Sequence, residues 1–145
     1  MLKGGMHMTT HPYLRAYMAG VAVPSVFLLL VLAALCVVRL EYNPEFPVER
    51  VLVFPLALVP AGWGIWNMVY LAMRKRRYMP LGCHGALVPV FLVPAGLGTA
   101  KALGVELPLG ASWTIVLVAL PLLMIVYYLA WKLLVGFLNE VLGIA

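Results

Sequence analysis

The hydropathy pattern of the chain is dominated by four long apolar stretches that short polar segments separate. The stretches cover about residues 17–38, 51–73, 81–103 and 112–131. Each is long enough to cross a bilayer as a helix, which takes about 20 mostly apolar residues. Because the connections are too short to hold a folded domain, the pattern predicts one membrane domain over residues 1–145, an all-α antiparallel bundle of four transmembrane helices.

The composition supports a membrane protein over a soluble one. Hydrophobic residues make up 65% of the 145 positions and charged residues 10%, and the mean hydropathy is +1.04. A soluble domain of this length could not bury so much apolar surface in its own core. The lipid bilayer is therefore the expected surroundings of most of the chain.

The Lys and Arg residues predict the orientation of the spans. With a cytoplasmic N-terminus, seven of the ten fall on the cytoplasmic side: Lys3, Arg15, Arg74, Lys75, Arg76, Arg77 and Lys132. The other three, Arg39, Arg50 and Lys101, fall on the opposite side. This asymmetry follows the positive-inside rule. We therefore expect both termini in the cytoplasm, and a multi-pass protein of a bacterial or archaeal cytoplasmic (inner) membrane. No groove-reading or base-stacking motif accompanies the basic residues, so no nucleic-acid partner is expected.

Prolines and the C-terminal segment affect the expected shape of the bundle. Each span contains at least one proline, which removes a helical hydrogen bond, so proline-kinked spans are expected. After the fourth span, residues 132–145 continue with Asn139 and Glu140 as the main polar groups. This segment is expected to form a helix that lies at the membrane interface or docks on a partner. A simple extension of the fourth span is the alternative.

An internal repeat marks the second and third spans. Residues 55–64 and 89–98 both fit the pattern Pro-x4-Pro-Ala-Gly-x-Gly, and on antiparallel neighbouring helices the two copies would lie at matching depth. Small residues at such spacing let helix backbones approach closely. The repeat is interpreted as a packing site or as a hinge between the two spans. Its residues are Pro60, Gly62, Gly64, Pro94, Gly96 and Gly98.

A polar and aromatic stripe runs along the second span. Trp63, Trp66, Asn67 and Tyr70 follow one another at i, i+3, i+4 and i+7, which puts them on one helical face. His84 of the third span falls at a similar depth to Asn67, so a hydrogen bond between the two is expected. One interpretation is a contact that holds the two helices together. The alternative is the wall of a pocket between the second and third spans for a quinone, a lipid or another amphipathic ligand.

Few residues in the spans could carry chemistry. Apart from Lys101 and Lys132 near the span ends, the apolar stretches contain no charged residue. Proton-coupled antiporters and intramembrane aspartyl proteases need ionisable groups at depth, so these classes are disfavoured. An enzyme would have to use His84 and Cys83, and no base with an orienting acid is evident for a nucleophile.

The sequence predicts no metal site, and no cofactor other than a bound lipid or quinone. Cys83 and His84 are adjacent, so their side chains point to different faces of a helix. His7 and His11 fall on the same predicted side, but nothing in their spacing resembles a paired-ligand motif. These residues therefore do not indicate a site for zinc or haem.

These features favour a small polytopic membrane protein without catalytic activity of its own. It would act as an accessory or oligomeric subunit, or as a minimal transport unit. The first alternative is a protein with the lipid or quinone pocket between the second and third spans. The second alternative is a membrane enzyme that uses His84 and Cys83. The expected partners are the bilayer and either further copies of the chain or other subunits of a membrane complex.

Overall fold

The protein is all-helical throughout the part of the chain that the structure describes, as the hydropathy pattern predicts. This computed structural model describes residues 11–42, 48–74, 76, 79–102, 104 and 113–144. Its elements in chain order are α1 (Pro12–Glu41), α2 (Val48–Met73), α3 (Leu81–Ala86), α4 (Val88–Ala102), α5 (Trp113–Ala130), the π-helical turn η1 (Trp131–Val135) and α6 (Gly136–Val141).

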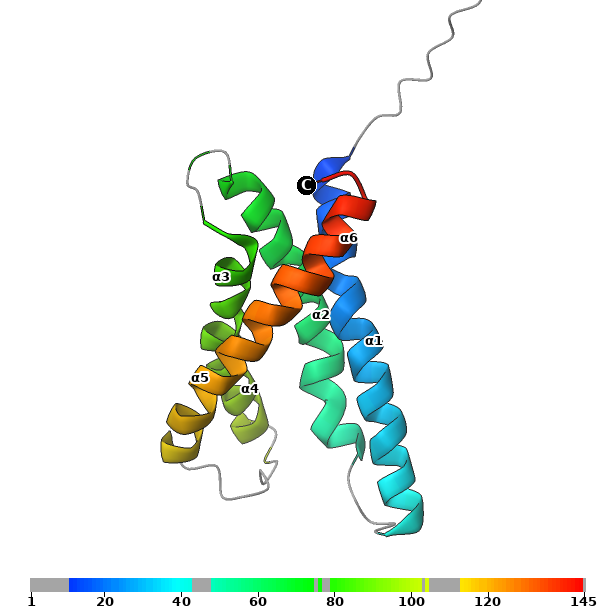
Figure 1. Cartoon of the computed structure of the whole chain (residues 1–145). Coiled ribbons are helices and arrows are strands. Elements are labelled where there is room, and N and C mark those ends of the chain that lie inside the picture. The colour runs from blue at the N-terminus through cyan, green and yellow to red at the C-terminus, as the bar shows by residue number, and fades with distance from the viewer. Residues whose placement is uncertain are drawn as a thin grey trace, which may run out of the picture.

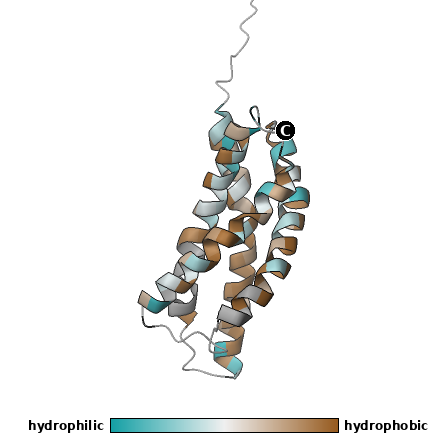
Figure 2. Cartoon of the chain, turned by 90° about the vertical axis from the view of Figure 1, so that its left-hand side faces the viewer, coloured by the Kyte–Doolittle hydropathy of each residue, from teal (hydrophilic) through white to brown (hydrophobic). Residues whose placement is uncertain are grey.

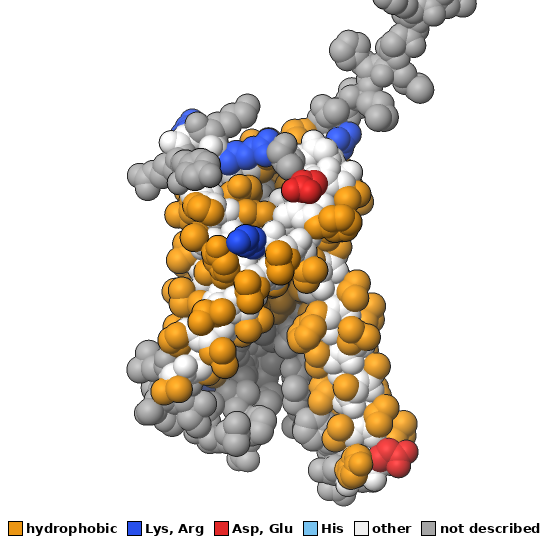
Figure 3. Space-filling view, viewed as in Figure 1, with side chains coloured by type: hydrophobic (Ala, Val, Ile, Leu, Met, Phe, Trp, Pro, Cys, Tyr) orange, Lys and Arg blue, Asp and Glu red, His pale blue; other side chains and the backbone are white. Residues whose placement is uncertain are grey.

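Three helical stretches are long and apolar enough to cross a membrane. They are α1, the stretch Leu81–Thr99 in α3 and α4, and the stretch Val118–Val141 in α5, η1 and α6. Apolar side chains cover most of the molecular face in Figure 3, and Figure 2 shows apolar residues along the length of the helices. A bilayer requires such an apolar surface on helices whose backbone groups are paired internally. The structure therefore supports a multi-pass membrane protein.

α1 and α2 form a closely packed pair (Figure 1). Their backbones approach each other closely at Gly20 of α1 and Gly64 of α2. A Cβ atom on Gly20 would lie 2.5 Å from the carbonyl oxygen of Trp63, and one on Gly64 would lie 2.6 Å from the ring of Tyr17. Because neither position has room for a side chain, these two glycines set the spacing of the helix pair.

α3 packs against α5 and η1 through two further glycines. A Cβ atom on Gly82 would lie 2.7 Å from the ring of Tyr128. One on Gly85 would lie 2.0 Å from Cγ of Trp131, whose side chain is fully buried. The sequence Gly82-Cys-His-Gly85 therefore brings the third stretch into contact with the fourth.

The third stretch, for which one proline-kinked span over residues 81–103 was expected, is divided into two helices. α3 ends at Ala86, Leu87 forms a turn, and α4 begins at Val88. Pro89 gives the physical reason, because a proline has no N–H for the carbonyl four residues earlier and its ring crowds that carbonyl. The interruption directly follows the contact of Gly85 with Trp131.

The fourth stretch runs as one rod from α5 through η1 into α6. Ala130 and Gly136, on either side of η1, both have right-handed helical backbone angles. The rod crosses α2 and ends beside the beginning of α1 (Figure 1). Residues 132–141 thus continue the helix beyond Trp131. The expectation that this part lies at the membrane interface or docks on a partner stays a prediction.

Two buried apolar clusters form the core. The central cluster joins α2, α4 and η1 and consists of Trp63, Val88, Trp131 and Val135. The second cluster lies where α1 begins and the described chain ends, and consists of Ala16, Ala19 and Ile144. Buried polar side chains are few among the described residues: Asn67, His84 and Asn139.

Candidate functional site

The aromatic and polar stripe of α2 divides between three different surroundings. Trp63 belongs to the central cluster, where its ring lies 5.4 Å from that of Trp131 and 5.0 Å from that of Tyr127. Trp66 pairs with α3, and Asn67 pairs with α6. The stripe is therefore not the wall of a single pocket between the second and third spans.

Trp66 and His84 link α2 to α3 by two hydrogen bonds. The indole N–H of Trp66 donates to the backbone carbonyl of His84 over 2.9 Å. In return, Nε2 of His84 lies 3.1 Å from the backbone carbonyl of Trp66, which can only accept, so this nitrogen carries the proton. The two rings stack with centroids 4.7 Å apart. The indole N–H of Trp66 and Nε2 of His84 are thus both paired inside the bundle, as in other helix-to-helix contacts in membranes.

Asn67 joins α2 to α1 and α6. Its amide donates to the carbonyl of Ala16 over 2.8 Å and to Oδ1 of Asn139 over 2.9 Å, and Nδ2 of Asn139 donates back over 3.3 Å. Both amide hydrogens of Asn67 are used in this way, so the expected bond to His84 is not formed. The estimate of similar depth on α2 and α3 was sound, but it could not say which neighbour each side chain faces.

Asn139 is the site residue that sequence reasoning missed. It was noted only as a polar group of the C-terminal segment. In the structure its side chain is buried, with 6% of its surface exposed. An amide within an apolar stretch of a membrane protein is costly without a partner. The pairing of Asn67 with a second asparagine could therefore have been considered from the sequence.

A Schellman turn ends α6 and returns the chain toward α1. The N–H of Gly143 donates to the carbonyl of Glu140, and the N–H of Ile144 donates to that of Asn139 over 2.8 Å. Gly143 has φ of +66°, a conformation that favours glycine. The turn carries Ile144 into the second cluster, where its side chain is 5% exposed.

Two arginines hold this turn in place. Arg15 of α1 donates to the carbonyl of Leu142 over 3.2 Å, and Arg74 at the end of α2 donates to that of Ile144. Cationic side chains at a helix C-terminus satisfy its free carbonyls and complement its dipole. The end of the described chain is thereby fixed across the start of α1 and the end of α2.

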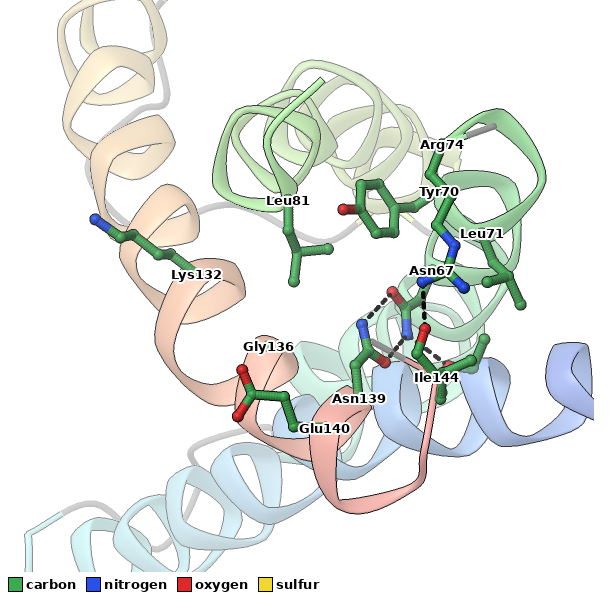
Figure 4. A pocket seen from close by; sticks show the side chains of 11 residues that line it. Asn67, Tyr70, Leu71, Arg74, Leu81, Lys132, Gly136, Asn139, Glu140 and Ile144 are labelled. Atoms are coloured by element: carbon green, nitrogen blue, oxygen red, sulfur yellow. Dashed lines mark hydrogen bonds between the residues drawn. The ribbon is translucent and has the colours of Figure 1, made fainter. Parts of the chain in front are cut away.

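A cavity of about 310 Å³ lies beside the amide pair. Its polar lining consists of Asn67, Tyr70, Arg74, Lys132, Asn139 and Glu140. Figure 4 shows Tyr70 and Arg74 on the α2 side of this space, and Lys132 and Glu140 on the side of η1 and α6. We call this space the polar cavity. It brings together Asn67 and Tyr70 of the expected ligand residues, but not Trp63, Trp66 or His84.

The central cluster lies deeper in the bundle than the polar cavity and does not line it. Trp63 precedes Asn67 by one turn of α2, and Trp131 and Val135 precede Asn139 along the rod, so all three lie nearer the opposite end of the bundle. Trp131 and Val135 have 0% exposure. Among the described residues, the polar cavity therefore does not continue as a polar path through the bundle.

A second, apolar crevice of about 500 Å³ lies between α1, α2 and the rod. Phe27 of α1, Val59 of α2 and Val126 of α5 are among its lining residues, and none of the described residues that line it is charged. Trp63 lies at its base with 4% exposure and with no acceptor for its indole N–H. Tyr127 is near enough for a weak side-chain interaction, but not with the geometry of a hydrogen bond.

The two copies of the repeat have different surroundings. Gly64 contacts Tyr17 and Val21 of α1, whereas a Cβ atom on Gly62 would lie 3.6 Å from Leu92 of α4. At Gly98 in the second copy nothing lies within 4 Å of such an atom. Pro94 is exposed, Pro60 and Gly96 are half-buried, and Pro94 lies inside α4. The hinge interpretation stays a prediction.

The residues considered for metal binding or catalysis do not assemble. Cys83 is exposed beside the buried His84, and His11 is exposed at the start of α1. The described ranges contain no group of three or more His, Cys, Asp or Glu residues that could hold a metal ion. His7 lies outside the described residues. The polar cavity is thus the best-developed candidate site.

Comparisons with known proteins assign no family. No protein family model, curated protein or solved structure matches the chain. The function of the polar cavity therefore has to be derived from its own residues and from their position in the bundle.

Proposed function

We propose that the protein is a non-catalytic membrane protein that binds the phosphate-bearing headgroup of an amphipathic lipid in its polar cavity. The observation that carries this proposal is the position of Arg74, which lines the cavity at the basic end of α2. Basic pockets between membrane helices on the cytoplasmic side are typical lipid-headgroup sites. The protein would serve as an accessory or oligomeric subunit rather than as an enzyme.

The proposed topology places the polar cavity at the cytoplasmic headgroup level. We propose four antiparallel, proline-kinked spans in a bacterial or archaeal cytoplasmic membrane, with α2 as the fourth spanning element and both termini inside. Arg15 and Arg74 lie together at the end where the chain turns back. The anionic inner leaflet attracts such residues.

The hydrogen-bonding groups of the polar cavity suit an oxygen-rich headgroup. Arg74 uses an Nη group to hold Ile144, and a guanidinium has further N–H donors that match phosphate oxygens. The amide pair of Asn67 and Asn139 forms a fixed polar floor. Leu71 and Leu81 add apolar walls on which the first carbons of a lipid chain can pack.

Substitution of Arg74 tests the proposal. The delipidated protein would be titrated with dioleoyl phosphatidylethanolamine and dioleoyl phosphatidylglycerol, and bound lipid would be counted by native mass spectrometry. Arg74→Gln should lose most of the bound lipid. Arg76→Gln, which removes the same charge at an exposed position two residues away, should keep it. Equal binding by both variants would refute the site.

A second variant separates binding from folding, because Arg74 also holds the end of the chain. Tyr70→Phe removes one hydroxyl that lines the polar cavity and leaves the bond between Arg74 and Ile144 intact. It should weaken lipid binding by about two- to fivefold without a change in thermal stability. The same preparation, purified in mild detergent, would also reveal any co-purifying subunit.

A quinone-type ligand in the apolar crevice is the second candidate. The unpartnered indole N–H of Trp63 at the base of this crevice favours a ligand that brings a carbonyl oxygen on a hydrocarbon chain. Trp63→Phe removes this donor. It should weaken binding of decylubiquinone by about fivefold, while Tyr127→Phe should not. Decylubiquinone binding by the Trp63 variant at the original affinity would exclude this role.

A further inference from the structure

The charged side chains of the polar cavity form two opposite poles. Arg74 lies on the α2 side, and the carboxylate of Glu140 lies on the α6 side (Figure 4). Glu140 is exposed and makes no ion pair within the described ranges. A cation and a carboxylate thus line the same space without neutralising each other.

Lys132 does not cancel the charge of Glu140. It is exposed, and its ammonium lies 5.8 Å from the centre of the Tyr128 ring, a side chain that does not line the cavity. Figure 4 shows the Lys132 side chain directed away from the amide pair. The carboxylate of Glu140 is therefore the charged group of α6 that a ligand in the polar cavity would meet.

This arrangement discriminates between headgroups of different charge. A purely anionic headgroup gains from Arg74, and to a smaller extent from Lys132, whose side chain is directed away from the amide pair, but it is repelled by Glu140, and like charges in one site oppose binding. A headgroup that carries both a phosphate and an ammonium can pair with both poles. A neutral headgroup pairs with neither.

We propose that the polar cavity selects a zwitterionic aminophosphate headgroup, with its phosphate at Arg74 and its ammonium at Glu140. This inference rests on the proposed lipid-binding function and names the ligand class. The Tyr70 hydroxyl and the amide pair supply neutral hydrogen-bonding groups between the two poles.

The size of the polar cavity agrees with this headgroup. Phosphoethanolamine has about eight non-hydrogen atoms, which occupy roughly 240 Å³ if each takes the volume of a water molecule in the liquid. The polar cavity measures about 310 Å³. The polar cavity is therefore of the right order of size for the headgroup, whose acyl chains would remain outside, against the apolar helix surface.

Competition between two lipids with identical chains tests the inference. Dioleoyl phosphatidylethanolamine and dioleoyl phosphatidylglycerol would be offered at equal concentration to the delipidated protein, and each bound species counted by native mass spectrometry. The wild-type protein should prefer phosphatidylethanolamine by about threefold or more, the effect expected of one partly exposed ion pair. Glu140→Gln should bring the ratio near one, because it removes both the attraction for the ammonium and the repulsion of the anionic lipid.

A matched control and a soluble probe sharpen the result. Glu41→Gln removes the same charge at the far end of α1 and should leave the preference of the wild type unchanged. O-phosphoethanolamine without chains should bind far more weakly than the lipid. If the soluble compound bound as tightly as the lipid, the cavity would still recognise an aminophosphate, but the ligand would not be a lipid.

The remaining outcomes separate the two proposals. Equal binding of both lipids by the wild type, a preference for phosphatidylglycerol, or an unchanged ratio in Glu140→Gln would overturn the zwitterion selectivity and leave lipid binding at Arg74 standing. Lipid binding that does not change in Arg74→Gln would overturn the proposed function, and the selectivity with it.

Discussion

Asn67 and Asn139 exchange hydrogen bonds across α2 and α6, with nitrogen-to-oxygen distances of 2.9 and 3.3 Å. They are 72 residues apart in sequence. Both side chains are buried, so each amide depends on the other for hydrogen bonds that solvent supplies at an exposed position. This pair ties the C-terminal segment to the second span and forms the floor of the polar cavity.

The amide pair should behave as a unit in a double-mutant cycle. Asn139→Leu leaves an amide hydrogen and the oxygen of Asn67 unpaired, so we expect a loss of about 1–2 kcal/mol in the free energy of unfolding. Asn67→Leu should cost more, because it also frees the carbonyl of Ala16. The double variant should cost less than the sum, as measured by SDS-induced unfolding. Additive losses would show that the two amides do not interact.

The contact between Trp66 and His84 should be separable into its two hydrogen bonds. His84→Phe keeps an aromatic ring against Trp66 and keeps the indole bond to the backbone, but removes the bond to the Trp66 carbonyl. Trp66→Phe removes the indole bond. Each should lower the unfolding free energy by about 1 kcal/mol.

The control for this pair is Tyr70→Phe. Its ring lies 5.4 Å from that of His84, and the substitution removes only a hydroxyl that faces the polar cavity. Its stability should equal that of the wild type. A loss as large as that of His84→Phe would mean that the hydroxyl, rather than the hydrogen bond of the histidine, supports the α2–α3 contact.

The hydropathy of the chain was sufficient to predict the helical class. It did not predict that the fourth helical stretch continues to Val141, ten residues beyond the expected end at residue 131. It was not sufficient to predict side-chain partners, because depth along a span does not define which neighbour a residue faces. Trp66 and His84 do lie at one level, yet Asn67 turns to Asn139 on a segment that hydropathy left outside the spans. Proline-kinked spans were expected, but hydropathy could not say that the third span divides at Leu87, because a proline inside an apolar stretch does not change its hydropathy.

Two glycines with contrasting surroundings should respond very differently to alanine. Gly85→Ala would put a Cβ atom 2.0 Å from Cγ of Trp131, whose ring has no room to move because it is fully buried. We expect a loss of several kcal/mol or a failure to fold. Gly98→Ala meets nothing within 4 Å and should be neutral or slightly stabilising in the α4 helix.

These two variants also examine the repeat of residues 55–64 and 89–98. Thermal unfolding in detergent, monitored by circular dichroism, measures both. A marked loss of stability in Gly98→Ala would indicate that this copy packs against something outside the described chain, such as a second molecule. Such a loss would support a packing role for the second copy, residues 89–98.

Cysteine labelling should reveal the number of spans and their orientation. In a chain with Cys36→Ser and Cys83→Ser, single cysteines would be introduced as Glu41→Cys, Arg76→Cys or Ala102→Cys, all at exposed helix ends or turns. With four spans and a cytoplasmic N-terminus, an impermeant maleimide should label the positions at 41 and 102 in intact cells and the position at 76 only after permeabilisation.

If α2 did not cross the bilayer, positions 41 and 76 would label together, and the polar cavity would no longer lie at the cytoplasmic headgroup level. Labelling of position 76 alone in intact cells would instead show the inverted orientation, with Arg15 and Arg74 on the outer side, contrary to the positive-inside rule.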